Sequence, residues 1–442
     1  MGKLKLSLAA IVALGGIANA QSLEEAIKGV GVSGYLSYEY EDNRFKNQNF
    51  IKDNNGSGEV AHTWKAEAEF KTPAQNAVSL SLGIRYDGTN NVNHGKGSPA
   101  NENTAPFLGE GLGSGNDGAF GVSTFYATIA PDSTSTNINI GKMYLTTPLN
   151  DSAYDRGTGI LATNSDLGYL TFIGGAFDSW SLDDLSGDLG DRSIAKPLYT
   201  AAFTFNHPFE NSGVEAQAWY FYIDKVLDSA IFAELKFNYG IFALSGQYAY
   251  ADVNNKGLDS ILQGLGVPQN SYVTKNDFIS LEASLDLESF EIPLGFRLGY
   301  ITNTKDNFAV SLDGEGELQK AGKIWFDNEA TEVNFSAIGG ALPTRDKKDL
   351  SVIYAGISYE LLESLSLELD YVNGANKLDS GGGKRDIDFY EITPSVLWKY
   401  SKNIEILTYY AMLKTERSGE ILAGETNSEN RNKFKVEATY YF

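Results

Sequence analysis

The chain of 442 residues contains no cysteine, and it has only 3 histidines and 3 methionines. The absence of cysteine excludes a disulfide framework, a thiolate metal site and a cysteine nucleophile. The histidines, His62, His94 and His207, lie far apart in the sequence and show no zinc-binding spacing. We therefore expect no cofactor and no metal centre built on histidine or cysteine.

Long apolar runs are also scarce. Beyond residue 20, no segment reaches the roughly 18 consecutive apolar residues that a membrane-spanning helix needs. Residues 1–20 place Lys3 and Lys5 before a short apolar stretch that ends in Ala18-Asn19-Ala20. This pattern predicts a cleaved signal peptide, with Gln21 as the first mature residue. A single membrane anchor is the alternative, but the apolar stretch is short and a cleavage site follows it.

Basic residues are too few to balance the acidic ones, because 35 Lys+Arg stand against 57 Asp+Glu and give a formal net charge of -22. Nucleic acid is therefore disfavoured as a partner, since contacts to phosphate require Lys and Arg. The excess of carboxylates favours cations. Part of it is also explained by the solubility of long acidic loops.

The chain does contain a repeated alternation of apolar and polar residues with a period of two. The last ten residues show it most clearly, with Phe434, Val436, Ala438, Tyr440 and Phe442 on one face and Lys433, Lys435, Glu437 and Thr439 on the other. Soluble proteins usually protect an exposed edge strand against aggregation, for example with proline or with charges on its apolar face. The last ten residues show no such protection. The pattern is typical of a transmembrane β-barrel, in which the apolar face meets lipid and the polar face meets a wet lumen.

Short connections alternate with long ones, which we place at 42–61, 88–119, 252–275, 301–349 and 414–431. Dividing 157–177 at Asn164-Ser165-Asp166 gives strands at Gly157–Thr163 and Gly168–Phe177 and an even total of eighteen, as bacterial barrels require. The sequence therefore predicts an all-β fold. It is a transmembrane antiparallel barrel with short periplasmic turns, long external loops and an aqueous lumen. Residues 21–442 would form this single domain, with a short periplasmic helix at 22–28.

The amino-terminal segment adds a family resemblance. Leu23-Glu24-Glu25-Ala26-Ile27-Lys28, followed by Val32-Ser33-Gly34 and a tyrosine-rich strand, resembles the mature start of Campylobacter-type major outer membrane porins. The resemblance implies an eighteen-strand, homotrimeric general-diffusion porin in contact with outer-membrane lipids and lipopolysaccharide. The terminal aromatic strand also resembles the signal that the barrel-assembly machinery reads.

Residues 143–156 follow the fifth predicted strand, where porins fold a loop into the lumen. This constriction loop carries Asp151, Asp155 and Arg156. We expect the two carboxylates to enrich cations at the narrowest point, as acidic rings do in other channels. Alternatively, Asp155 and Arg156 only hold the loop in place, by pairing with each other or with the wall.

Four inward positions are candidates for the lumen wall opposite this loop: Lys65, Glu67, Arg85 and Lys435. The last strand and the first three are neighbours in a closed barrel, so the three basic residues could form a basic wall facing an acidic loop. An ordinary solvated lumen face is the alternative. One charge acting on an ion at 4 Å contributes about 1 kcal/mol in water and about 4 kcal/mol at a dielectric of 20, so we expect only a modest cation preference.

One acidic segment offers a weak calcium candidate through Asp184, Asp188 and Asp191, although no EF-hand pattern is present. The preferred interpretation is a porin for passive diffusion of ions and small hydrophilic solutes. A surface adhesin that uses long loops such as 301–349 is a second hypothesis. A barrel enzyme is a third, but the sequence shows no G-x-S-x-G motif.

Overall fold

The computed structural model describes residues 29–52, 55–93, 119–181, 193–194, 196–254, 273–314, 316–326, 328–337, 347–379, 383–419 and 423–442. The predicted signal peptide and the predicted helix at 22–28 lie outside these ranges. Within them, no helix is both long enough and apolar enough to cross a membrane.

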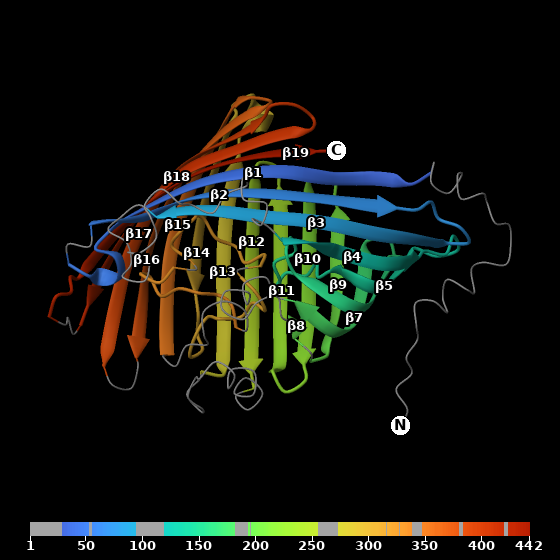
Figure 1. Cartoon of the computed structure of the whole chain (residues 1–442), viewed down its shortest axis with the longest axis horizontal. Coiled ribbons are helices and arrows are strands. Elements are labelled where there is room, and N and C mark those ends of the chain that lie inside the picture. The colour runs from blue at the N-terminus through green and yellow to red at the C-terminus, as the bar shows by residue number, and fades with distance from the viewer. Residues whose placement is uncertain are drawn as a thin grey trace.

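The described residues form one antiparallel sheet that closes on itself (Figure 1). In chain order the strands are β1 (Gly31–Lys46), β2 (Asn55–Lys71), β3 (Val78–Asn93), β4 (Ala119–Ile129), β5 (Thr136–Tyr144), β6 (Arg156–Asn164), β7 (Leu170–Ser181), β8 (Ser193–Ile194), β9 (Leu198–Pro208), β10 (Ser212–Ile223), β11 (Leu227–Tyr239), β12 (Phe242–Val253), β13 (Lys275–Asp286), β14 (Leu294–Thr302), β15 (Lys347–Leu362), β16 (Leu365–Asp379), β17 (Lys384–Lys399), β18 (Ile404–Ser418) and β19 (Ser428–Tyr441). Two short 3-10 helices, η1 (Gln48–Phe50) and η3 (Glu288–Phe290), lie in connections. Since β8 pairs only with the end of β7, the wall is a closed barrel of 18 strands, which confirms the predicted fold.

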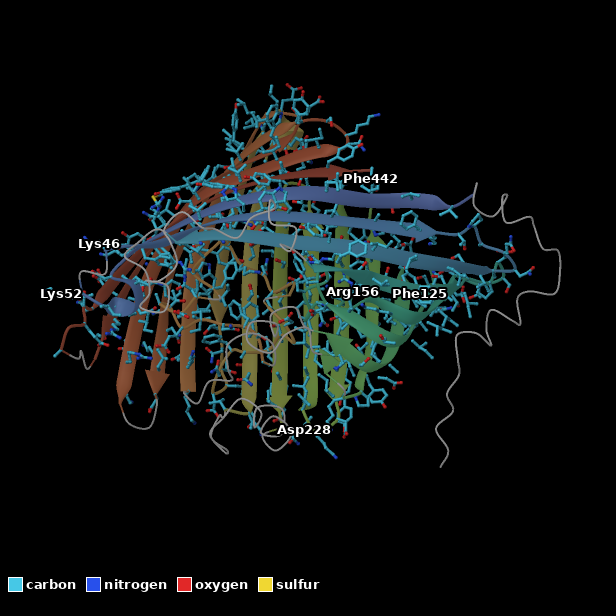
Figure 2. All side chains as sticks on the ribbon, viewed as in Figure 1. Lys46, Lys52, Phe125, Arg156, Asp228 and Phe442 are labelled. Atoms are coloured by element: carbon cyan, nitrogen blue, oxygen red, sulfur yellow. The ribbon has the colours of Figure 1, made fainter. Side chains whose placement is uncertain are left out.

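The barrel closes where the first and last strands meet. β1 pairs with β19 in a register that places Tyr38 opposite Ala438, and the main chains of Gly34 and Phe442 exchange two hydrogen bonds of 3.0 and 3.1 Å. Lys46, at the end of β1, and Lys52, in the connection to β2, lie at the opposite end of the wall, far from Phe442 (Figure 2). Both chain ends of the sheet therefore lie at the end of the barrel that carries the short turns.

The two faces of the wall have the polarity that the alternation predicts. Leu36 on β1 points outward and is 52% exposed, whereas its neighbour Ser37 points inward and is buried. Aromatic side chains such as Tyr300, Tyr371 and Tyr440 are exposed on the outer surface. Such amphipathic rings prefer the interface between lipid and water, so these positions suit an aromatic girdle.

Several strands are longer than the alternation indicated. The predicted loop at 42–61 is mostly strand, because β1 continues to Lys46 and β2 begins at Asn55. The boundaries predicted for 88–119 and 414–431 are wrong for the same reason, since β3 continues to Asn93 and β18 to Ser418. Above the hydrocarbon layer both faces of a strand meet water, so the apolar alternation stops while the hydrogen-bonded ladder continues.

The described residues between β14 and β15, within 303–337, lie inside the barrel, although we expected residues 301–349 to form an external loop. Phe308, Trp325 and Phe335 of this segment are almost fully buried. Trp325 stacks on Phe389 of β17 with ring centroids 5.6 Å apart, and Phe335 meets Phe278 of β13 at 5.3 Å. Burying one such aromatic side chain contributes about 1.5–3 kcal/mol. A hydrophobic core therefore occupies the part of the lumen next to β10–β17.

The closure of the barrel depends on Gly34, and this gives a first prediction. A Cβ at position 34 would lie 2.1 Å from the carbonyl oxygen of Glu67 and 2.8 Å from the ring of Phe442. Gly34→Ala should therefore destabilise the folded barrel by about 1–3 kcal/mol, the usual cost of overpacking. The measurement is the temperature at which the detergent-solubilised protein loses its compact electrophoretic mobility.

Gly174→Ala is the matched control, because a Cβ on Gly174 in β7 would have no neighbour within 4 Å. Equal melting temperatures for the two variants would contradict the role assigned to the β1–β19 contact.

Candidate channel constriction

The loop between β5 and β6, residues 145–155, turns into the lumen. Its Tyr154 contacts basic side chains of β2 and β3 on the wall. The Tyr154 hydroxyl hydrogen-bonds to Lys65 Nζ of β2, and the ring lies 4.4 Å from the guanidinium carbon of Arg85 on β3. The Lys65 ammonium also lies over this ring, 4.8 Å from its centroid. A neutral aromatic ring between two cations is stabilised by both of them, which fixes the tip of the loop.

The three charged residues predicted for the constriction differ in exposure. Asp155 is fully buried, and its Oδ2 accepts a hydrogen bond of 2.8 Å from Asn150 Nδ2. Arg156 is 5% exposed, and its guanidinium stacks on Tyr144 and lies 3.7 Å from Glu67 Oε2. Only Asp151 is half-buried, and its Oδ1 accepts the backbone N–H of Ala153. The geometry of Asp155 and Arg156 therefore matches the alternative in which these residues hold the loop.

The segment after β14 joins this loop inside the lumen. The backbone N–H of Leu312 donates to the carbonyl of Leu149 at 2.7 Å, and that of Glu317 donates to the carbonyl of Pro148 at 2.9 Å. The constriction is therefore built from two in-folded segments, which we call the first loop (145–155) and the second loop (303–337, as far as it is described).

Two carboxylates of the wall hold the second loop. Glu391 of β17 is fully buried, and its two oxygens accept the backbone N–H groups of Lys323 at 2.5 Å and Ile324 at 2.9 Å. Asp370 of β16 accepts the N–H of Gly322 at 3.1 Å. Gly322 has a φ of +80° and lies against Glu391, so a glycine is required for the backbone to approach this closely.

A pair of carboxyl groups lies at the junction between the two loops. Asp313 of the second loop is fully buried and faces Asp155 of the first loop. Burial, followed by the nearby Asp155, raises the pKa of Asp313 to about 8, while the backbone N–H of Gly314 opposes this shift. Asp151 adds a further acidic neighbour. Burial and the acidic neighbours therefore favour the protonated form of Asp313, which avoids two adjacent buried charges.

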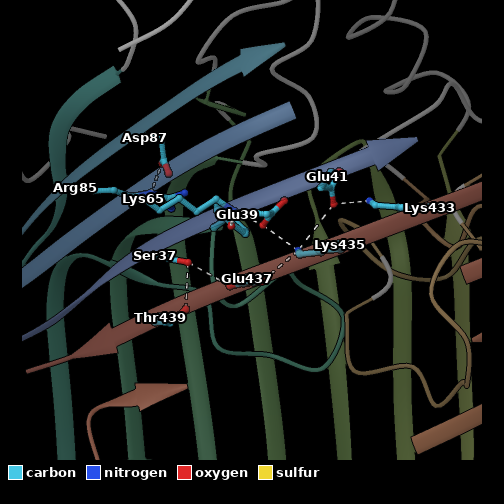
Figure 3. Close-up of polar contacts among 11 residues, drawn as sticks. Ser37, Glu39, Glu41, Lys65, Arg85, Asp87, Lys433, Lys435, Glu437 and Thr439 are labelled. Atoms are coloured by element: carbon cyan, nitrogen blue, oxygen red, sulfur yellow. Dashed lines mark hydrogen bonds and ion pairs between the residues drawn. The ribbon is translucent and has the colours of Figure 1, made fainter. Parts of the chain in front are cut away.

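The predicted basic wall exists as a group of neighbours, but each cation has an acidic partner (Figure 3). Lys435 of β19 lies 2.9 Å from Glu39 and 3.2 Å from Glu437, and Lys433 lies 2.5 Å from Glu41. On β2 and β3, Lys65 lies 3.9 Å from Glu39, and Arg85 pairs with Asp87. The fourth predicted wall residue, Glu67, accepts hydrogen bonds from Ser123 and Tyr144. Positive and negative side chains therefore alternate along the wall. The electrostatic potential that they produce at a distance is weaker than that of a purely basic surface.

No group of three or more acidic, histidine or cysteine side chains among the described residues is arranged to hold a metal ion. The calcium candidate formed by Asp184, Asp188 and Asp191 lies outside the described residues.

The alternation places Asp370 and Glu391 on the inner wall, but it did not predict the second loop or the role of these two residues as its anchors. A signal was nevertheless present, because strands beside this loop are apolar on both faces, as in Trp219-Tyr220-Phe221-Tyr222-Ile223 of β10. Phe221 and Ile223 point into the lumen and are fully buried. Apolar inward positions in a barrel wall indicate that something other than water covers them.

The closed barrel, its apolar outer surface and its narrowed lumen define the chain as a transmembrane channel of the porin class. Comparison with solved structures agrees on the fold. Pseudomonas aeruginosa OpdQ is similar with a TM-score of 0.57 at 14% identity, over 95% of this chain and 100% of that one. Pseudomonas aeruginosa OprD is similar with a TM-score of 0.56 at 12% identity, over 93% of this chain and 95% of that one.

The model of the Campylobacter major outer membrane protein family matches residues 1–440, so the chain belongs to that family. It is an outer-membrane porin, as the sequence resemblance implied. A search among curated proteins found no match.

The anchor at Glu391 generates a second prediction. Glu391→Ala removes a buried acceptor that serves two backbone N–H groups. A hydrogen bond to a charged group contributes about 1.5–3 kcal/mol, so the second loop should dock more weakly and the lumen should widen. Single-channel recording should show a larger and noisier conductance than in the wild type.

Glu416→Ala is the control, because Glu416 is an exposed carboxylate of β18 that is paired with Lys414. A wild-type conductance in Glu391→Ala would contradict the anchoring role.

The carboxyl pair generates a third prediction. A carboxyl group with a raised pKa in the folded state binds more protons there than in the unfolded state. Its contribution to stability is therefore largest below the unfolded pKa of about 4, and it is lost as pH rises toward the folded pKa. For Asp313 this window runs from about 4 to about 8. Because asparagine does not titrate, Asp313→Asn should make the melting temperature depend less on pH within this window.

Asp349→Asn, at an exposed position of β15, controls for the loss of one carboxylate. Melting curves of wild type and Asp313→Asn that keep the same slope between these pH values would contradict the assignment.

Proposed function

We propose that this porin is a passive channel with a modest preference for cations, and that it works as a homotrimer. The main support for the cation preference is that the basic side chains of the lumen wall are neutralised by acidic partners. Because Lys65, Arg85, Lys433 and Lys435 all have acidic partners, the unbalanced carboxylates of the lumen decide the sign of the local potential. At 0.1 M salt this potential decays over about 10 Å, so anions are depleted but still pass.

The remaining parts of the proposal rest on the sequence and on the family. The signal peptide would be cleaved after Ala20, and the aromatic strand β19 would be recognised by the barrel-assembly machinery. Family membership and fold favour a channel over an enzyme. Burial of much of the described part of 303–337 in the lumen favours the channel over the adhesin hypothesis, whose candidate segment was 301–349.

The test is the reversal potential across a planar bilayer in a KCl gradient. We expect the wild type to favour K⁺ over Cl⁻. Asp151→Asn should reduce this preference, because Asp151 is only half-buried and is the more accessible of the two carboxylates predicted for the first loop. Asp155→Asn should change it little, because Asp155 is fully buried.

Asp388→Asn, at an exposed site of β17, is the control for a change in net charge alone. An anion preference in the wild type would overturn the proposed selectivity. Absence of any conductance from correctly folded protein would overturn the channel itself.

A further inference from the structure

The second loop leaves the sector of the lumen beside β19, β1, β2 and β3 to water. The inner wall of this sector carries charged side chains, among them Lys435, Glu39 and Lys65 (Figure 3). On the other side of the lumen the second loop covers the wall, and its Trp325 stacks on Phe389 of β17. A hydrophilic solute therefore passes between the charged sector and the second loop.

Lys323 lies on the part of the second loop that is attached to β17. Its backbone N–H donates to Glu391 Oε1 at 2.5 Å, and the flanking N–H groups of Gly322 and Ile324 are also held by carboxylates of the wall. Gly322 and Ile324 are buried, whereas the side chain of Lys323 is exposed. Because this segment lies inside the barrel, Lys323 is exposed to the water of the lumen.

The ammonium of Lys323 differs from the other cations of the lumen in its surroundings. The basic side chains of the wall pair with carboxylates. Lys320 of the second loop places its ammonium over the ring of Phe326, 4.8 Å from the centroid, and donates to the carbonyl of Leu318 at 3.3 Å. Among the described residues, Lys323 has no ion-pair partner. Its charge is therefore not cancelled locally.

An uncancelled charge at this position reaches the passage. The charged sector begins at β19 and β1, and β1 lies three strands from β17, which is about 14 Å along the wall. At 0.1 M salt the field of a charge decays over about 10 Å. Ions that pass between Glu391 and the charged sector therefore experience the field of Lys323.

We propose that Lys323 is a specificity-determining residue of the channel. Its ammonium attracts small anions to the passage and repels cations, so it limits the cation preference that the lumen carboxylates produce. Asp370 and Glu391 act as positioning residues, because they fix the backbone on both sides of Lys323. The inference rests on the proposed channel selectivity and adds the residue that keeps this selectivity modest.

The chain contains no cysteine, so Lys323→Cys introduces a single reactive thiol into the full-length porin. Two methanethiosulfonate reagents of similar size attach either a trimethylammonium or a sulfonate group to it. The measurement is the reversal potential in a KCl gradient near 0.1 M. The ratio of K⁺ to Cl⁻ permeability should rise about twofold in Lys323→Cys, because a positive charge is lost. It should return toward the wild-type value with trimethylammonium and rise further with sulfonate.

Lys402→Cys, in the exposed turn between β17 and β18, is the control and receives the same two reagents. Its permeability ratio should stay at the wild-type value with either adduct. Raising the salt to 1 M shortens the screening length to about 3 Å, so the differences among the Lys323→Cys forms should largely disappear. Differences that persist at high salt would show a displaced loop and overturn the proposed role of the charge.

Two further results would overturn the proposal. One is a shift of the permeability ratio that is absent in Lys323→Cys or equal for the two adducts. The other is a thiol at position 323 that neither reagent modifies in the folded protein, as measured by mass spectrometry. An anion preference in the wild type would refute the proposed channel selectivity alone, if the two adducts still shift the ratio in opposite directions.

Discussion

The whole structure depends on a continuous ring of backbone hydrogen bonds around the barrel. Hydrocarbon offers no partner to an exposed N–H or C=O group, so a sheet can cross a membrane only when it has no free edge. The contact between β1 and β19 removes the last edge, and Gly34 and Phe442 complete it at the short-turn end. Every inward position is then fixed, because each strand's register is set by its neighbours.

A closed wall still leaves a wide lumen, and two in-folded segments narrow it. They are held by different means. The second loop is anchored by apolar burial around Trp325 and by the acceptors Asp370 and Glu391. The first loop is held at Tyr154 by the cations of Lys65 and Arg85. The junction between them contains the buried pair of Asp155 and Asp313.

The charged lumen shows how pairing limits selectivity. On the side of β19, β1, β2 and β3, cations and carboxylates alternate and largely cancel. On the side of β13 to β16, carboxylates outnumber the single Arg297. The lumen is therefore asymmetric, and a solute meets a balanced surface on one side and an acidic one on the other.

The sequence by itself determined the barrel, its strand number and the direction of each face, because a period of two follows directly from strand geometry and from lipid on one side. The tertiary structure alone decided which lumen charges meet and which loops fold inward. Lys435 meets Glu39 across two strands that are hundreds of residues apart in the chain. Asp155 is buried by a segment that begins after residue 302. Such contacts depend on register and on heights along tilted strands, which local alternation does not encode.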